Sequence, residues 1–276
     1  MTVDVTSIPP LEAVVSLAEK AGLAIMALYN GEEPGVTLKE DVSPVTLADL
    51  AAHRVILAGL QELTPLLPIL SEESEAIPYS DRRNWDRYWL VDPLDGTKEF
   101  IKRNGEFTVN IALIVKGEPL LGVVHAPALG RTYSAVLGKG AFRQESSRER
   151  PSRIVVHRKG GRKLKFVVSR SHPGAEAEAF LRALGTYDTV QIGSSLKFCL
   201  VAEGSADIYP RFGPTREWDT AAGHCVLSSA GGAVTDLHGQ PLRYNKPDLL
   251  NPPFIATGIL KRSSYQWHRL AGERLS

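Results

Sequence analysis

The chain has 276 residues, of which 43% are hydrophobic and 23% are charged, and its formal net charge at pH 7 is +1. Such a composition is typical of a globular protein that buries a substantial core in one large or two ordinary domains. The near-neutral charge gives no reason to expect a nucleic acid polymer or an anionic membrane as a partner.

The sequence predicts a cytoplasmic protein. Its first residues lack the basic stretch, the apolar stretch and the small-residue cleavage site of a signal peptide. No apolar run approaches the ~20 residues that cross a bilayer, so no transmembrane segment is expected. The two cysteines, Cys199 and Cys225, form no CxxC pair, which favours buried thiols over a disulfide or a zinc site.

Two amphipathic helices are predicted near the N-terminus. Apolar residues recur at helical spacing over 11–28 and again over 47–63, where Leu47 is among the residues expected to face inward. The second helix opens with Thr46 and Asp49, which fit the first and last positions of a capping box. This would give Asp49 a purely structural role.

Acidic residues follow two predicted strands. The apolar run 66–70 leads into the acidic pair 72–73, and the bulky run 88–91 leads into Asp92 and Asp95. Carboxylates are the oxygen ligands that Mg²⁺ prefers, and backbone N–H groups at the start of a helix bind phosphate. Together they form the layout of metal-assisted phosphoryl transfer. The alternatives are a solvated loop for the first pair and an Asx turn for the second.

The turn after the second of these strands has a strong local signature. Because Pro93 cannot donate a hydrogen bond to a sheet ladder, we expect the strand to end at Asp92. Gly96 supplies the backbone freedom for the reversal, and Thr97 is expected to cap a helix that starts at Lys98. The turn therefore directs its carboxylates toward a helix N-terminus.

Strands dominate the following part of the chain. Residues 107–115 and 120–125 predict a hairpin, and residues 132–136 predict a strand beside it. The glycine-containing segment 138–140 is predicted to be a hairpin turn, because it lacks the glycine spacing and the helix of a phosphate-binding loop.

The charged, serine-rich segment 143–152 marks the predicted domain boundary. It separates an N-terminal metal-binding α+β domain, residues 1–150, from a C-terminal α/β domain, residues 151–276, in which strands and helices alternate.

Asp219 precedes a helix pattern of small residues, with a plain N-cap as its alternative role. The basic cluster 157–165 lacks interleaved aromatic residues, so a solvated loop is expected there rather than nucleic-acid binding.

Two long segments resemble the signature sequences of the lithium-sensitive, Mg²⁺-dependent phosphatases of the inositol monophosphatase superfamily. One comprises residues 88–110, and the other comprises residues 192–199 and 210–219. Within the superfamily the chain resembles most the CysQ-type 3′(2′),5′-bisphosphate nucleotidases, because inositol phosphatases usually differ at 98–99 and at Ser71. The resemblance spans nearly the whole chain. It implies an α/β fold, a layered αβαβα sandwich of two stacked domains with the metal site in the cleft between them.

The resemblance also implies a magnesium site with two or three ions. Glu72, Asp92 and the backbone carbonyl of Leu94 should hold the first ion. The second should be held by Asp92, Asp95 and Asp219. Two such ions can bind both the attacking and the leaving oxygen of an in-line displacement.

The implied nucleophile is a water molecule activated by the metals. Glu72 and Thr97 should position this water, and the Thr97 hydroxyl should contact Asp49, so these three are the expected catalytic residues. Backbone N–H groups of Gly96 and Thr97 should bind the reacting phosphate. No serine or cysteine stands out beside a histidine, so no covalent phosphoenzyme is expected.

A second phosphate on the substrate needs partners beyond the metals. By the resemblance, Ser194, Lys197 and Arg211 bind the 5′-phosphate, and His172 lies near the nucleoside. From the residues alone, the alternatives are a helix cap, a solvated helix lysine and a strand-end arginine. The full set of implied substrate contacts is Leu94, Asp95, Gly96, Thr97, His172, Ser194, Lys197, Arg211 and Asp219.

The implied activity is removal of the 3′-phosphate of 3′-phosphoadenosine 5′-phosphate to give AMP and phosphate, which would serve sulfate assimilation. The sulfated analogue, 3′-phosphoadenylyl sulfate, is an implied second substrate. One alternative is an inositol monophosphatase or sugar-bisphosphate phosphatase of the same superfamily, and another is a non-catalytic sensor of nucleotide and metal. The resemblance leaves room for peripheral contact with the cytoplasmic face of the cell membrane. A monomer and a homodimer both stay open.

Overall fold

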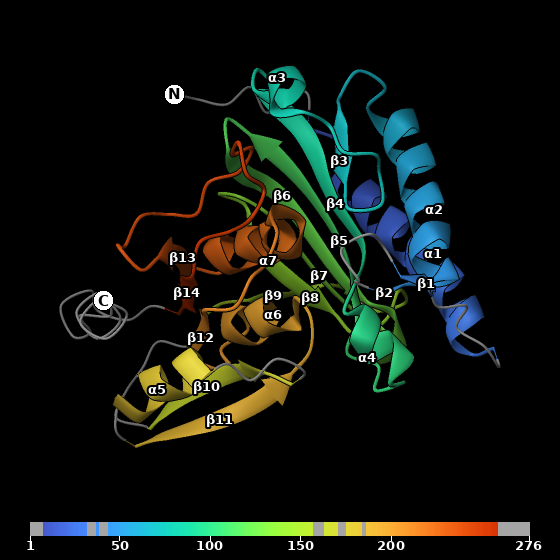
Figure 1. Ribbon diagram of the computed structural model, residues 1–276. Coiled ribbons are helices and arrows are strands. Elements are labelled where there is room, and N and C mark those ends of the chain that lie inside the picture. Colours follow the sequence, from blue (N-terminus) through green and yellow to red (C-terminus); the bar gives the residue numbers. More distant parts are fainter. Residues whose placement is uncertain are drawn as a thin grey trace.

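Figure 1 shows the computed structural model, in which two large β-sheets have helices between them and on their outer faces, and β1 and β2 form a separate two-stranded sheet. The structure describes residues 8–31, 37–38, 44–156, 163–170, 175–183 and 186–258. His172, a predicted substrate contact, and residues 157–162 of the basic cluster lie outside the described residues.

The larger sheet has seven strands in the order β3-β4-β5-β6-β7-β8-β9. β3 and β4 pair in parallel, and all other neighbours in this sheet are antiparallel, as the predicted hairpin over 107–125 requires. The strands are β3 (Ile69–Ser71), β4 (Arg87–Asp95), β5 (Thr108–Val115), β6 (Glu118–Ala126), β7 (Arg131–Val136), β8 (Gly140–Gln144) and β9 (Ser152–Ile154).

Two long helices, α1 (Leu11–Tyr29) and α2 (Leu47–Leu63), cover one face of the larger sheet. Their apolar residues and those of the facing strands form one buried cluster, as the helical periodicity predicts. The prediction was wrong for Leu47, which is 54% exposed. The buried face of α2 begins one residue after Leu47 and contains Ala48, Ala52, Ile56 and Leu60.

The smaller sheet has five strands in the order β11-β10-β12-β14-β13. β10 pairs in parallel with β11 and β12, whereas β14 is antiparallel to β12 and β13. The strands are β10 (Leu164–Ser169), β11 (Tyr187–Ile192), β12 (Ile208–Arg211), β13 (Ala233–Asp236) and β14 (Phe254–Thr257).

Helices α6 (Leu196–Ala202) and α7 (Glu217–Ser229) lie between the two sheets, and α5 (Ala175–Ala183) covers the outer face of the smaller one. Neighbouring residues of β10 show the two faces. Phe166 packs in the cluster that includes α5, whereas Val167 packs in the cluster that includes α6 and α7. The predicted αβαβα sandwich is confirmed.

Helix α7 approaches the larger sheet closely where it crosses Gly122 in β6. A Cβ atom at Gly122 would lie 2.6 Å from the backbone oxygen of Ala222 and 2.7 Å from Cys225 Cβ. Any side chain there would push the helix away from the sheet. Since α7 carries Asp219, this approach helps to set where that acid lies.

One predicted strand end was wrong. β4 does not end at Asp92 but continues through Pro93 to Asp95. The pairing with β5 shifts register between Asp92 and Asp95, and such a bulge accommodates a residue that has no N–H to donate.

The remaining described elements are β1 (Thr37–Leu38), β2 (Pro44–Val45), α3 (Tyr79–Arg82), α4 (Thr97–Ile101) and the 3₁₀-helix η2 (Pro127–Leu129). Among the described helices, there is none with the length and apolarity that crossing a bilayer requires. The domain boundary at residue 150 stays a prediction, and β9 pairs with β8 in the larger sheet just after it.

Candidate active site

Three of the predicted metal ligands meet where two strands end and one helix begins. Glu72 directly follows β3, Asp92 lies near the end of β4, and Asp219 lies in the first turn of α7. The parallel pairing of β3 and β4 brings the first two together, and Glu72 N donates a hydrogen bond to Val91 O at 3.1 Å. One carboxylate oxygen of each acid lies within 4.8 Å of the other two.

Burial and the nearby negative charges raise the pKa values of Asp92 and Asp219. Asp92 is 1% exposed, and burial with repulsion from Glu72 and Asp95 raises the pKa of its carboxyl well above the ordinary value. Burial, followed by the charge of Asp95, raises the pKa of Asp219 to about 8. Carboxylates this close require protons or a cation, and a hard divalent cation suits an all-oxygen set. Glu72, Asp92 and Asp219 therefore form a candidate metal centre, and Asp95 lies outside this group of three.

Asp49 combines its structural role with a contact to the predicted catalytic threonine. It is 2% exposed, and its Oδ2 accepts hydrogen bonds from Thr46 N at 2.8 Å and from Thr46 Oγ1 at 2.6 Å. Its Oδ1 accepts a hydrogen bond from Thr97 Oγ1 at 3.3 Å. The capping box and the predicted contact with Thr97 are thus both present, one on each carboxylate oxygen.

The helix after β4 begins one residue earlier than predicted. Thr97 is the first residue of α4, and Gly96 is the N-cap, with a left-handed φ of 93°. A Cβ atom at Gly96 would lie 3.2 Å from Glu106 O and 3.3 Å from Ser194 Cβ. Glycine is therefore needed here both for its backbone angle and for the space it leaves.

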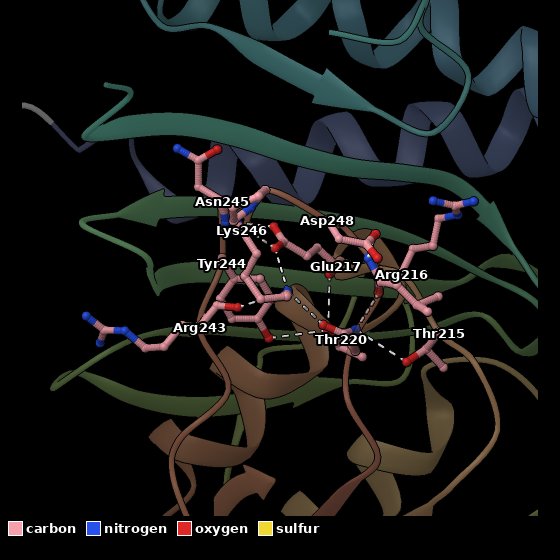
Figure 2. A network of polar contacts seen from close by, with 12 residues as sticks. Thr215, Arg216, Glu217, Thr220, Arg243, Tyr244, Asn245, Lys246 and Asp248 are labelled. Atoms are coloured by element: carbon pink, nitrogen blue, oxygen red, sulfur yellow. Dashed lines mark hydrogen bonds and ion pairs between the residues drawn. The ribbon is translucent and has the colours of Figure 1, made fainter. Parts of the chain in front are cut away.

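A buried polar network holds the first turn of α7 (Figure 2). Arg216 N donates a hydrogen bond to Asp219 Oδ2 at 2.8 Å, so Asp219 is the third helical residue and not a plain N-cap. Glu217 is 0% exposed, and its carboxylate accepts hydrogen bonds from Asn245 N at 2.7 Å and Lys246 N at 2.9 Å. Lys246 Nζ forms an ion pair with Glu217 at 2.5 Å. No pattern in the sequence indicated this role for Glu217.

A cavity of about 940 Å³ adjoins the acidic residues. Asp95 and Asp219 line it, together with the predicted phosphate contacts Ser194, Lys197 and Arg211. The structure thus brings the three predicted phosphate contacts into one cavity with two of the acids.

Lys197 is buried, so its alternative role as a solvated helix lysine was wrong. The side chain is 7% exposed, and its Nζ lies 5.6 Å from the centroid of the Tyr209 ring. Burial lowers the pKa of the Lys197 ammonium to about 8, although the nearby charge of Asp95 raises it. A buried cation is costly without an anionic partner, so a phosphate in the cavity would stabilise it.

Ser194 and Arg211 offer polar atoms to the same cavity. Among the described residues, the buried Ser194 Oγ and Arg211 Nε have no hydrogen-bond partner. Ser194 adopts a left-handed φ of 46° and precedes Ser195, the N-cap of α6, so it is not the helix cap that was its alternative role. Arg211 ends β12, and its Nη2 donates to Pro214 O at 2.9 Å. Unpaired buried polar atoms in a cavity wall suit a polar ligand.

Two further contacts near the site were not identified from the sequence. Ser195 Oγ lies 2.9 Å from Asp95 Oδ2. Glu106 accepts hydrogen bonds from Arg170 Nε and Nη2, both at 2.7 Å, and from Gly193 N at 2.8 Å, which ties the segment before β5 to the loop before α6. The partners are far apart in the chain, so the position of Ser195 and Glu106 inside the two family-like segments was the only signal.

The chain is similar to proteins of known activity over nearly its whole length. The CysQ 3′(2′),5′-bisphosphate nucleotidase of Escherichia coli K12 is 55% identical over 246 residues, which cover 88% of this chain and 98% of that protein. The corresponding nucleotidase of Haemophilus influenzae is 37% identical over 274 residues, which cover 94% of this chain and 96% of that protein.

Solved structures agree with these sequence relationships. CysQ from Bacteroides thetaiotaomicron, a bacterial member of the inositol monophosphatase family, superposes with a TM-score of 0.79 at 43% identity and covers 90% of this chain and 96% of its own. An IMPase of Thermotoga maritima superposes with a TM-score of 0.77 at 26% identity, covering 95% of this chain and 96% of its own. The sequence model of the inositol monophosphatase family matches residues 9–268. The predicted resemblance is confirmed, and the chain belongs to the inositol monophosphatase family.

Proposed function

We propose that this protein is a Mg²⁺-dependent 3′(2′),5′-bisphosphate nucleotidase that converts 3′-phosphoadenosine 5′-phosphate to AMP and phosphate, with the sulfated analogue as a second substrate. The observation that carries the proposal is the buried ammonium of Lys197 in the cavity that Asp95 and Asp219 also line. A second, non-reacting phosphate supplies the anion that this cation needs. An inositol monophosphate has no such group.

The donor set of the candidate centre suits Mg²⁺, which we propose binds in two or three sites. Glu72, Asp92 and Asp219 would hold it, with Asp95 and the Leu94 carbonyl as further ligands. When bound, the metal stabilises negative charge on the phosphate oxygens and makes a coordinated water a better nucleophile at neutral pH.

The side chains around this centre are placed to orient a water molecule. Thr97 Oγ1 donates its single hydrogen to Asp49, so the lone pairs of the Thr97 oxygen are left to accept a hydrogen bond. Glu72 offers a second acceptor. A water that attacks phosphorus must lose a proton, and two fixed acceptors orient it and assist that loss.

The cysteines do not suit a covalent mechanism. Both thiols are free and fully buried in α6 and α7, as predicted. Burial raises the pKa of Cys225 to about 12 and that of Cys199 well above its ordinary value, so neither thiol ionises readily.

The cytoplasmic location, the peripheral membrane contact and the choice between monomer and homodimer stay predictions.

Phosphate release from four substrates tests the proposed function. We expect the highest kcat/KM on 3′-phosphoadenosine 5′-phosphate, and lower values on 3′-AMP, inositol monophosphate and a sugar bisphosphate. EDTA should abolish turnover and excess Mg²⁺ should restore it, because the acids alone cannot stabilise the charge on the phosphate. A preference for inositol monophosphate would favour the alternative phosphatase activity, binding without turnover would indicate a sensor, and turnover in EDTA would contradict the metal centre.

The Lys197→Met variant tests the substrate assignment. Methionine keeps the buried aliphatic stem beside Tyr209 and removes the charge. A charge-assisted hydrogen bond contributes about 1.5–3 kcal/mol, so kcat/KM for the bisphosphate should fall by roughly ten- to a hundred-fold. The value for 3′-AMP, which carries only the reacting phosphate, should change little.

The matched control is Lys139→Met, which removes an exposed lysine in the turn between β7 and β8. This variant should behave as the wild type on both substrates. Equal losses on the bisphosphate and on 3′-AMP in the Lys197 variant would mean that this lysine supports the fold or the metal centre. If the Lys197 variant keeps the wild-type preference for the bisphosphate over 3′-AMP, Lys197 does not contact the substrate.

A further inference from the structure

Ser195, the N-cap of α6, contacts two of the acids that the proposed function assigns to the metal centre, Asp95 and Asp219. Its hydroxyl oxygen lies 2.9 Å from Asp95 Oδ2 and 2.8 Å from the backbone oxygen of Asp219, and the residue is 1% exposed. We propose that Ser195 is a positioning residue that fixes the Asp95 carboxylate for metal binding and couples it to the first turn of α7. The proposal rests on the proposed function, in which Asp95 is a metal ligand.

The hydrogen of the Ser195 hydroxyl is directed by a chain of buried polar groups. Asn110 Nδ2 donates a hydrogen bond to Ser195 Oγ at 2.9 Å, and Asn110 Oδ1 accepts one from Thr108 Oγ1 at 3.1 Å. The contact with Thr108 orients the amide of Asn110, so that its NH₂ group faces Ser195. Because Ser195 accepts from Asn110, its own hydrogen is free to be donated toward the two acids. Thr108 is 0% exposed and Asn110 is 1% exposed, so water does not compete for these bonds.

Ser195 has two acceptors for one hydrogen, Asp95 Oδ2 and the Asp219 carbonyl. The two contacts are of similar length, 2.9 Å to Asp95 and 2.8 Å to the Asp219 carbonyl, and a carboxylate that binds a cation is ionised and accepts the stronger hydrogen bond, so Asp95 would be the preferred acceptor when the metal is bound. With Oδ2 engaged in this way, Oδ1 is the oxygen of Asp95 left for an ion, and rotation of the carboxylate is restricted. In metal sites generally, residues that do not touch the ion commonly donate hydrogen bonds to its ligands and so fix their orientation.

The position of Ser195 in the chain extends this role toward the substrate. Lys197, the proposed contact of the second phosphate, follows Ser195 by two residues and lies in the short helix α6. Ser194, which directly precedes Ser195, lines the same cavity as Lys197. Asp95, Asn110 and the first turn of α7 thus hold the start of α6 from three sides. Ser195 therefore positions both Asp95, the proposed metal ligand, and the helix that carries Lys197.

The Ser195→Ala variant tests this proposal in the full-length protein without substrate. Mg²⁺ affinity is measured by titration calorimetry and by the rise in Tm with Mg²⁺ concentration. Loss of a group that orients a metal ligand commonly weakens metal binding about 10–100-fold, so a fall of roughly tenfold or more is expected. At saturating Mg²⁺, kcat should recover at least in part, since the carboxylate itself is unchanged. The matched control is Ser134→Ala, which removes a buried hydroxyl in β7 and should leave Mg²⁺ affinity and turnover at wild-type values.

A second variant keeps the test decisive if Ser195→Ala does not fold. Thr108→Val removes the hydroxyl that orients Asn110 but keeps the backbone pairing of Thr108 with Asp95, so it should weaken Mg²⁺ binding in the same direction but less. Where Ser195→Ala does fold, the two losses should not add in the double variant, because Ser195→Ala already breaks the same chain of bonds. Additive losses, or a Thr108→Val protein that binds Mg²⁺ as the wild type does, would overturn the proposed path through Asn110.

Other outcomes separate this proposal from the proposed function. A Ser195→Ala protein that melts at a lower temperature but binds Mg²⁺ as the wild type does would show a structural role only and overturn the positioning role. If the wild-type protein itself neither binds Mg²⁺ nor releases phosphate, the proposed function fails, and the role of Ser195 fails with it. A wild-type enzyme that is active, beside a Ser195→Ala variant equal to it in Mg²⁺ affinity, would overturn the role of Ser195 alone.

Discussion

Replacing Asp92 with Asn is expected to abolish turnover and at the same time to stabilise the metal-free protein. Asp92 is 1% exposed and lies among Glu72, Asp95 and Asp219, so its charge is destabilising until a cation binds. Asparagine keeps the shape and an oxygen that can accept the hydrogen bond from Leu94 N, 3.1 Å away. Turnover should fall about 10²–10³-fold or more, the scale for loss of one preorganised electrostatic contact. The free energy of unfolding without metal should rise by about 0.5–2 kcal/mol.

The pH dependence of stability provides a second measure of the burial and repulsion of these carboxylates. The pKa of Asp219 is about 8 in the folded protein and 3.8 in its ordinary state. The folded protein therefore holds more protons than the unfolded chain between these values, and the stability that results is lost as pH rises through about 8. The Tm of the metal-free wild type should fall from pH 6 to pH 9. Added Mg²⁺, which requires ionised ligands, should raise the Tm more at pH 8 than at pH 6.

The control for Asp92→Asn is Asp81→Asn, which changes an exposed aspartate in α3. It should alter neither turnover nor the Tm of the metal-free protein. A well-folded Asp92→Asn protein with near-normal turnover would mean that Asp92 is a turn residue and not a metal ligand. A lower Tm in the absence of metal would mean that the Asp92 carboxylate does not destabilise the metal-free protein.

The Glu217→Gln variant is expected to lose about 1–3 kcal/mol of the free energy of unfolding, the usual cost of leaving a buried hydrogen-bond donor without its acceptor. Glu217 is 0% exposed, and its carboxylate binds two backbone N–H groups and the ammonium of Lys246 (Figure 2). Glutamine keeps one oxygen and turns an NH₂ group toward these donors, so at least one donor loses its acceptor. Equilibrium unfolding in urea measures the loss.

Glu118→Gln is the matched control, because Glu118 pairs with Arg243 at the surface. The two side chains are 59% and 55% exposed, so the pair should contribute no more than about 1 kcal/mol. Equal losses from Glu217→Gln and Glu118→Gln would mean that burial adds nothing to the first pair. A Glu217→Gln protein as stable as the wild type would show that the network around α7 contributes no net free energy.

The acids of the site could be predicted because their signals are local. An apolar run that ends in acids places Glu72 after β3 and Asp92 near the end of β4, and the capping pattern places Asp49 in the first turn of α2. These signals depend on a few neighbouring residues and on periodicity, which the sequence displays directly. The layered fold then followed from the order of the elements and from the family-like segments.

Burial and distant contacts could not be predicted in the same way. Lys197 lies in α6, a helix of 7 residues, which is too short for periodicity to show which face is buried. Ser195 and Asp95 are 100 residues apart in the sequence, and no local pattern links them. The extension of β4 through Pro93 depends on a register shift against β5, which only the paired strands define.

Three acids of the site and its two cations belong to different parts of the sandwich, and a fourth acid, Asp219, lies in α7 between the two sheets. Glu72, Asp92 and Asp95 are carried by the larger sheet, whereas Lys197 and Arg211 are carried by α6 and β12 on the side of the smaller sheet. If Lys197 and Arg211 bind the second phosphate as proposed, substitutions at these two positions in α6 and β12 should change the preferred phosphate ester and leave the acids of the larger sheet in place. After gene duplication, drift in these two elements is a short route to a new substrate, and they are also the place to begin redesigning specificity in the laboratory.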